Sequence, residues 1–118
     1  MKSYSELIVL VNYLNATTAE SGSKKELKLK KIVEKIKPLF DVYNEKREDI
    51  RLEHAYADSN GILDLNEKGE YKYTKEGVKG MNNDFKELLT QTFNFELLEI
   101  GTDGIEDLFF LSGWVKGM

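Results

Sequence analysis

The sequence predicts a mostly helical α+β protein with a long second helix, and three observations support this fold class. In three segments, apolar residues recur at three- and four-residue steps, as they do on one face of a helix. Two shorter segments alternate apolar and polar residues, as strands do. The single proline argues against a many-turned β-sandwich. We therefore expect one domain over residues 1–118, containing an antiparallel helix pair, a β-hairpin, a third helix and a C-terminal strand.

The first helix is expected over residues 3–16. Ser3 and Glu6 have the spacing of a capping box, in which the hydroxyl accepts from a free N–H and the carboxylate accepts from the cap residue's own N–H. Tyr4, Leu7 and Val11 then follow on one helical face. The small, polar residues 17–23 are typical of a loop, and so short a loop predicts that the next helix packs antiparallel to the first.

The long helix is expected over residues 24–58. Its apolar seam repeats every seven residues at Leu29, Ile36 and Tyr43, and it becomes polar at Arg47 and His54. Pro38 lies inside the helix, where a proline removes one backbone hydrogen bond and clashes with the preceding turn. The repeat continues across Pro38 and favours one kinked helix; a break into two helices is the alternative.

The remaining elements are a hairpin at 62–73, a helix at 75–91 capped by Thr74, and a strand at 93–98. Leu63 and Leu65 alternate along one arm of the hairpin, and Tyr71 and Tyr73 along the other. An isolated hairpin is only marginally stable, so we expect it to lean on the helices or on a partner. One option is that the last strand joins the hairpin in a small antiparallel sheet.

Residue types exclude several kinds of chemistry. With no cysteine, the chain has no disulfide, thiol nucleophile or Cys-ligated zinc. His54 is the only histidine, which favours a packed or surface side chain over a metal ligand. The segment 64–69 resembles a calcium loop, but Lys68 replaces an oxygen ligand. Phosphate-binding and nucleophile-elbow motifs are missing. We therefore expect a protein that is not an enzyme and that has no cofactor or metal.

Charge is unevenly distributed. The whole chain carries a net charge of −4, yet seven lysines against two glutamates give residues 24–37 a net charge of +5. Four of these lysines form a stripe at helical spacing, the lysine stripe: Lys24, Lys28, Lys31 and Lys35. Such a stripe can follow a phosphate backbone, but no aromatic residue interleaves with it and the rest of the chain is acidic. Weak nucleic-acid binding is therefore an alternative, and a solvated face is favoured.

The order of several short motifs resembles a group of small tailed-phage and prophage proteins. The motifs span roughly residues 24–100 and comprise Phe40 to Ile50 with its Tyr43-x-x-x-Arg47 step, Asp58-Ser59-Asn60-Gly61, Gly69-Glu70-Tyr71, Asn83 to Leu89, and Phe95-Glu96-Leu97. The group usually has a proline–lysine pair and an asparagine before the centre of the long helix, where this chain has Ser23-Lys24-Lys25 and Lys37-Pro38. The resemblance implies a phage origin and a non-catalytic role.

We accordingly expect a phage-type module for protein–protein interaction, either virion-associated or an accessory to assembly. A host-directed inhibitor of a bacterial defence or regulatory protein is the alternative. The candidate interface residues are the aromatic and apolar side chains of the hairpin and C-terminus, with one seam arginine: Arg47, Leu63, Leu65, Tyr71, Tyr73 and Trp114. For the apolar ones, core packing is the alternative reading, and we take Trp114 to be exposed. The expected partner is a phage structural protein or a host protein, or a second copy in a homo-oligomer. The expected location is the virion or the host cytoplasm, without a membrane span, because the apolar run from Leu7 to Val11 is too short for one.

Overall fold

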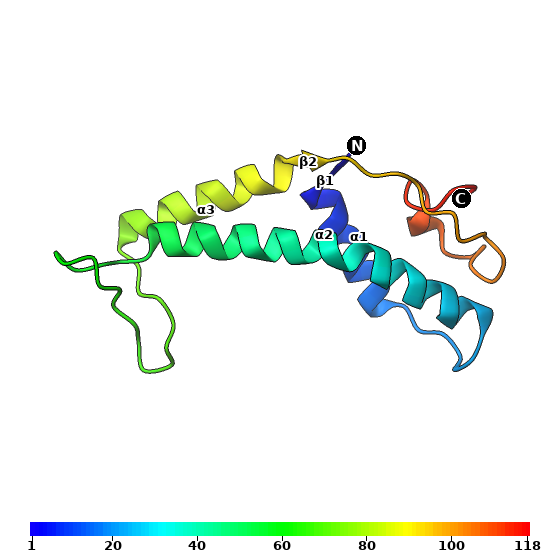
Figure 1. Cartoon of the computed structure of the whole chain (residues 1–118), viewed down its shortest axis with the longest axis horizontal. Coiled ribbons are helices and arrows are strands. Elements are labelled where there is room, and N and C mark those ends of the chain that lie inside the picture. The colour runs from blue at the N-terminus through cyan, green and yellow to red at the C-terminus, as the bar shows by residue number, and fades with distance from the viewer. The chain divides into compact units, whose positions relative to one another are not determined.

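Three helices and two very short strands make up the regular structure of the computed structural model, which describes residues 1–118 (Figure 1). In chain order the elements are β1 (Lys2–Ser3), α1 (Tyr4–Ala16), α2 (Lys24–His54), α3 (Lys75–Thr90), β2 (Thr92–Phe93) and the 3₁₀ turn η1 (Phe109–Leu111). The mostly helical α+β class with a long second helix is thus confirmed. None of the helices combines the length and the hydropathy that crossing a membrane requires.

The chain divides into two units, each with its own set of internal contacts. Unit 1 comprises Met1–Asp41 and Thr92–Met118, and unit 2 comprises Val42–Gln91. Helix α2 therefore contributes residues 24–41 to unit 1 and residues 42–54 to unit 2.

Helix α1 begins as the sequence predicts. The Ser3 hydroxyl accepts from the Glu6 N–H at 3.2 Å, and the Glu6 carboxylate accepts from the Ser3 N–H at 3.1 Å, which completes the capping box. Leu7 and Leu10 on the inner face of α1 are almost fully buried. Within unit 1, α1 and the first part of α2 run in roughly opposite directions, as expected for the helix pair (Figure 1).

Helix α2 continues through Pro38 as one helix, so the alternative of two separate helices is wrong. Pro38 is exposed, and the carbonyl that loses its partner four residues earlier belongs to the exposed Glu34, where water can satisfy it. The helix ends at His54 and not at Asp58. Its end is set by tertiary pairing, because the N–H of Tyr56 donates to the carbonyl of Lys72 at 2.7 Å.

Two tight turns without regular strands follow α2: the first, at Asp58, precedes the predicted hairpin, and the second, at Asn66, is the turn of the hairpin itself. Ala57 pairs with Leu63 and Leu65 pairs with Tyr71, both antiparallel. The Asp58 carboxylate accepts from two N–H groups in the first turn, and the Asn66 side-chain oxygen does the same in the second. Backbone bonds also join the arms of the hairpin, because the Asn66 N–H donates to the Glu70 carbonyl at 2.9 Å and the Lys72 N–H donates to the Asp64 carbonyl at 3.1 Å.

The C-terminal strand expected over 93–98 is present only as β2, and the expectation that it lies beside the hairpin is wrong. Strand β2 pairs antiparallel with β1, with Lys2 opposite Phe93 and Ser3 opposite Thr92. Farther along, the N–H of Leu98 donates to the carbonyl of Trp114 at 2.8 Å. Residues 92–98 thus pair with the two ends of the chain inside unit 1, a long-range choice that local alternation does not encode.

Helix α3 begins after Thr74, whose hydroxyl accepts from the Gly77 N–H at 3.0 Å, as predicted. It ends at Thr90, one residue before the predicted end. Gly77 and Gly80, which weaken a helix in isolation, both face the end of α2. A Cβ at Gly77 would lie 2.8 Å from the His54 carbonyl oxygen, and one at Gly80 would lie 2.8 Å from the His54 ring. The two glycines therefore allow α3 to approach His54 closely.

Candidate interaction surface

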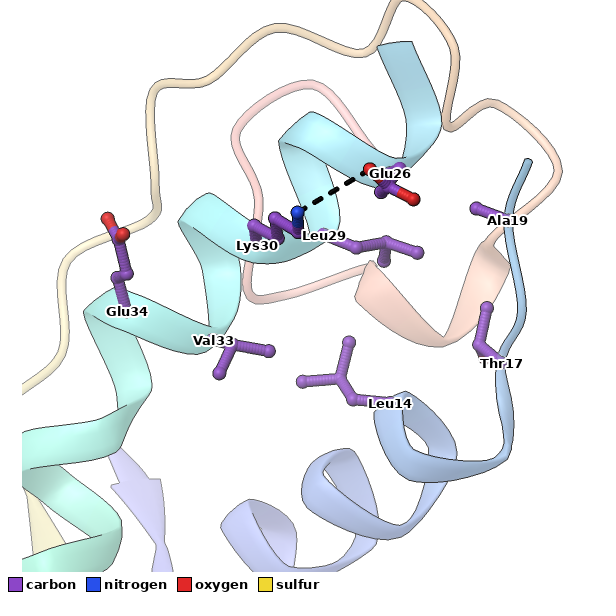
Figure 2. Close-up of a pocket in the computed structure, with 8 residues that line it drawn as sticks. All are labelled: Leu14, Thr17, Ala19, Glu26, Leu29, Lys30, Val33 and Glu34. Carbon is purple, nitrogen blue, oxygen red and sulfur yellow. Dashed lines mark ion pairs between the residues drawn. The ribbon is translucent and has the colours of Figure 1, made fainter. Parts of the chain in front are cut away.

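An open apolar groove lies between α1 and the first part of α2 in unit 1. It has a volume of about 410 Å³ and is lined by residues of α1, of the loop that follows and of α2: Leu14, Thr17, Ala19, Glu26, Leu29, Lys30, Val33 and Glu34. Figure 2 shows the side chains of Leu14 and Val33 pointing toward each other across it, with Leu29 beside them. Val33 remains 46% exposed although it lies one helical turn after the seam residue Leu29.

A second hollow of about 190 Å³ extends the groove along the same two helices. It shares Leu14 and Val33 with the first hollow, and its further lining residues are Val11, Asn15, Ile36, Lys37 and Phe40. Because the two hollows share these side chains, they form one apolar groove, which we call the α1–α2 groove. Apolar side chains left at such a surface are suited to receiving those of a partner.

Charges of alternating sign follow the α2 side of the groove. Glu26, Lys30, Glu34 and Lys37 succeed one another at steps of four, four and three residues, so they lie on one helical face. Lys30 Nζ lies 3.5 Å from a Glu26 carboxylate oxygen, as the dashed line in Figure 2 marks. The Glu34 side chain points away from Leu14 and Val33 into solvent (Figure 2).

The lysine stripe is partly neutralised inside unit 1. Lys24 Nζ lies 2.7 Å from Asp103, and the neighbouring Lys25 lies 3.3 Å from Asp107. The hydrogen bond with Asp103 raises the pKa of the Lys24 ammonium, and the same bond lowers the pKa of the Asp103 carboxyl. Of the other three residues of the lysine stripe, Lys28 is half-buried, whereas Lys31 and Lys35 are exposed. Acidic side chains beside the stripe work against phosphate binding there.

Trp114 was expected as an exposed interface residue, and the structure shows that it is buried. Its side chain is only 4% exposed and packs edge-on against Phe95, with ring centroids 4.9 Å apart. Lys2 Nζ lies 5.0 Å from the Trp114 ring centre, a cation–π contact. Core packing is therefore the role of Trp114 in unit 1.

The other predicted interface residues lie in unit 2, and the fold brings only some of them together. Leu65 is 47% exposed, whereas Leu63 is half-buried. Tyr71 and Tyr73 line a hollow of about 490 Å³ with Glu48, Arg51, Gly69, Glu70 and Met81. Partial burial and a hydrogen bond with the Glu48 carboxylate raise the pKa of the Tyr71 phenol, which ties the second turn to α2.

Arg47, the seam arginine among the candidate interface residues, packs on aromatic rings in unit 2. Its guanidinium carbon lies 5.1 Å from the Phe85 ring centre and 5.8 Å from that of Tyr43. Arg51 approaches the same Phe85 ring at 5.8 Å. The planar guanidinium group is suited to such stacking, so the polar end of the seam forms a cation–π cluster with α3.

His54 is half-buried at the C-terminal end of α2 and pairs with Asp84 of α3. Its Nε2 lies 2.6 Å from an Asp84 carboxylate oxygen. Sequence reasoning missed this pair because the two residues lie thirty positions apart. The two helix glycines were the available signal, since a glycine inside a helix often marks a close approach.

The sequence also did not single out the groove as a candidate surface. Leu29 belongs to the predicted seam, and Leu14 and Val33 fall at helical spacing on the apolar faces of their helices, a pattern that predicts ordinary packing. Nor did the sequence single out Phe109, which is 80% exposed in η1. In comparisons with protein-family models, curated proteins and solved structures, no match to the chain was found.

Proposed function

We propose that the chain is a non-catalytic module for protein–protein interaction that acts through the α1–α2 groove and binds a second copy of itself there. The observation that carries the proposal is an open groove with apolar side chains at its centre and charges of alternating sign along one side. A partner helix with apolar residues at three- and four-residue steps would fill such a groove.

The order of charges on α2 supports a second copy as the occupant. When two α2 segments lie antiparallel, Glu26 of one faces Lys37 of the other, and Lys30 faces Glu34. Both pairs then recur by symmetry, as a two-fold interface requires. Opposite charges at matching positions fix the register and direction of the pair, while the apolar side chains supply most of the affinity.

The apolar centre of this arrangement falls beside Val33. Val33 is adjacent to the midpoint between Lys30 and Glu34, where the two copies would come closest, and Leu29 lies about one helical turn before Val33. Covering the exposed part of Val33 removes apolar surface from water, which favours association by about 25 cal/mol per Å².

Self-association agrees with the setting that the motif resemblance suggests. A phage-type module in the virion or in assembly acts through copies of itself and through other structural proteins. No triad or phosphate-binding motif competes with this reading, so we propose a role without catalysis.

Charge reversal gives a direct test by sedimentation equilibrium over about 1 μM to about 1 mM protein. We expect the unchanged chain to dimerise within this range. Glu34→Lys places two lysines opposite each other and should weaken the dimer by about tenfold or more. The double variant Lys30→Glu/Glu34→Lys restores opposite charges and should recover most of the lost affinity.

The control is Glu45→Lys, which makes the same change in net charge on an exposed part of α2 in unit 2. It should leave the dimer unaffected. A chain that stays monomeric throughout the range, or a double variant no tighter than Glu34→Lys, contradicts the proposed occupant.

A further inference from the structure

Three side chains with metal-binding atoms meet in unit 2, where the end of α2 approaches α3. His54 and the adjacent Glu53 come from α2, and Asp84 comes from α3. One ligand atom from each residue lies within 4.8 Å of the other two. Glu53 is exposed, whereas His54 and Asp84 are half-buried, so the cluster is open to solvent on one side.

The close packing of α3 holds the histidine ring in place. A Cβ at Gly80 would lie 2.8 Å from Cε1 and 3.0 Å from Nδ1 of His54, so the ring lies directly against the α3 backbone. The 2.6 Å contact with Asp84 fixes the Nε2 edge of the ring. A ring held on two sides loses little freedom when it binds a ligand.

We propose that Glu53, His54 and Asp84 bind a divalent transition-metal ion of the zinc class. One imidazole nitrogen and two carboxylate oxygens form a three-ligand set, and water can complete a tetrahedron on the open side. The nitrogen ligand favours zinc, cobalt or nickel over magnesium or calcium, which prefer oxygen alone.

The geometry requires only small side-chain movements. Tetrahedral ligands at zinc's usual bond lengths lie about 3.4 Å from one another. The His54–Asp84 pair, now 2.6 Å apart, would open slightly, and the exposed Glu53 side chain would move inward. The proton that joins His54 and Asp84 occupies the place that the metal would take, so zinc displaces it on binding.

Such an ion would join α2 to α3 within unit 2. Binding to the folded state alone raises stability with ligand concentration, so zinc should raise the melting temperature of the chain. The site shares no residue with the α1–α2 groove, because all three residues belong to unit 2.

The single histidine makes the test direct. In the tag-free full chain, one set of imidazole signals reports on His54, and zinc chloride is the probe. Two-dimensional ¹H–¹⁵N NMR should show one ring nitrogen shifting as zinc is added, and titration calorimetry should give one site per chain. Imidazole signals that do not move overturn the proposal.

Two substitutions separate a three-ligand site from zinc binding at a lone histidine. Glu53→Gln and Asp84→Asn should each weaken zinc binding by at least about tenfold, since losing even an outer-shell partner costs about 10–100-fold. Glu45→Gln, on an exposed part of α2, is the matched control and should bind zinc like the unchanged chain. Circular dichroism checks that each variant folds. Unchanged zinc affinity in either ligand variant overturns the proposed site.

Discussion

Units 1 and 2 are held together by different kinds of contact. Of twelve buried apolar side chains, ten belong to unit 1 and only two, Tyr43 and Leu88, to unit 2. In unit 1, α1, α2 and the C-terminal segment each contribute, through Leu7, Ile32 and Leu111 among others. Unit 1 therefore relies on the burial of apolar surface.

Unit 2 relies more on directional contacts. Arg47 and Arg51 pack on Phe85, and His54 pairs with Asp84. Glycines let α3 approach α2, and the side-chain oxygens of Asp58 and Asn66 accept backbone N–H groups inside the two turns. Each such contact stabilises the fold modestly, so we expect unit 2 to open locally at lower free energy than unit 1.

The difference suggests a division of roles. Unit 1 provides a frame of buried apolar side chains for the α1–α2 groove, whereas unit 2 carries the polar cluster in which we propose a metal site. Well-packed elements hold the residues of an interface in fixed positions. A unit with few buried side chains depends more on the stability that a bound ligand adds.

The largest effect is expected from a cavity in the core of unit 1. Leu7 is fully buried, so Leu7→Ala should lower the free energy of unfolding by about 2–5 kcal/mol. Urea denaturation followed by tryptophan fluorescence measures this directly, because Trp114, the only tryptophan, lies in unit 1. Val9→Ala on the exposed face of α1 is the control, with an expected change within about 0.5 kcal/mol. A loss below about 1 kcal/mol for Leu7→Ala would contradict the apolar frame.

A smaller effect is expected from a methyl group added between α2 and α3 in unit 2. Gly80→Ala places a Cβ against the His54 ring, a clash that should cost about 1–3 kcal/mol. The higher helix propensity of alanine offsets up to about 1 kcal/mol of this cost. Hydrogen exchange at the amides of 75–90 should report the net loss. In a His54→Ala background the clash disappears, so Gly80→Ala should become stabilising there. An equal loss of stability in both backgrounds would contradict the close approach of α3 to the His54 ring.

The smallest change in the free energy of unfolding is expected at acid pH. It should come from carboxyl groups in unit 1. The Ser3 N–H donates to Glu6 and lowers the pKa of its carboxyl below 4.5, and Lys24 lowers that of Asp103 below 3.8. Lowered values mean that the stabilisation is present above these pH values and is lost as pH falls through the folded-state pKa. In unit 2 the pKa of Tyr71 is raised, so its contribution is lost on the alkaline side, above 10.0.

For the exposed Glu6 we expect a change below about 1 kcal/mol between neutral and acid pH. Glu6→Gln should remove that part of the pH dependence, because glutamine can still accept from Ser3 but does not titrate. Urea denaturation of both chains at several pH values, followed through Trp114, makes the comparison. An equal pH dependence in the two chains would contradict the role of the cap.

Local patterns in the sequence determined the three helices and both N-terminal caps. Ser3 with Glu6 and Thr74 with Gly77 act within one turn, so their hydrogen bonds follow from spacing alone. The repeat of Leu29, Ile36 and Tyr43 likewise predicted α2 through Pro38. The Asp58 and Asn66 turns also follow from neighbouring residues.

Tertiary structure alone decided the long-range pairings. Strand β2 pairs with β1 at the other end of the chain, Trp114 is buried against Phe95, and Asp84 meets His54. The end of α2 was also fixed from outside, by the bond from Tyr56 to Lys72. A periodic pattern predicts which face of a helix or strand is apolar, but it does not predict which distant segment of the chain covers that face. For the same reason the sequence predicted the apolar face of α2, and only the fold showed that Leu14 and Val33 leave part of that face open as a groove.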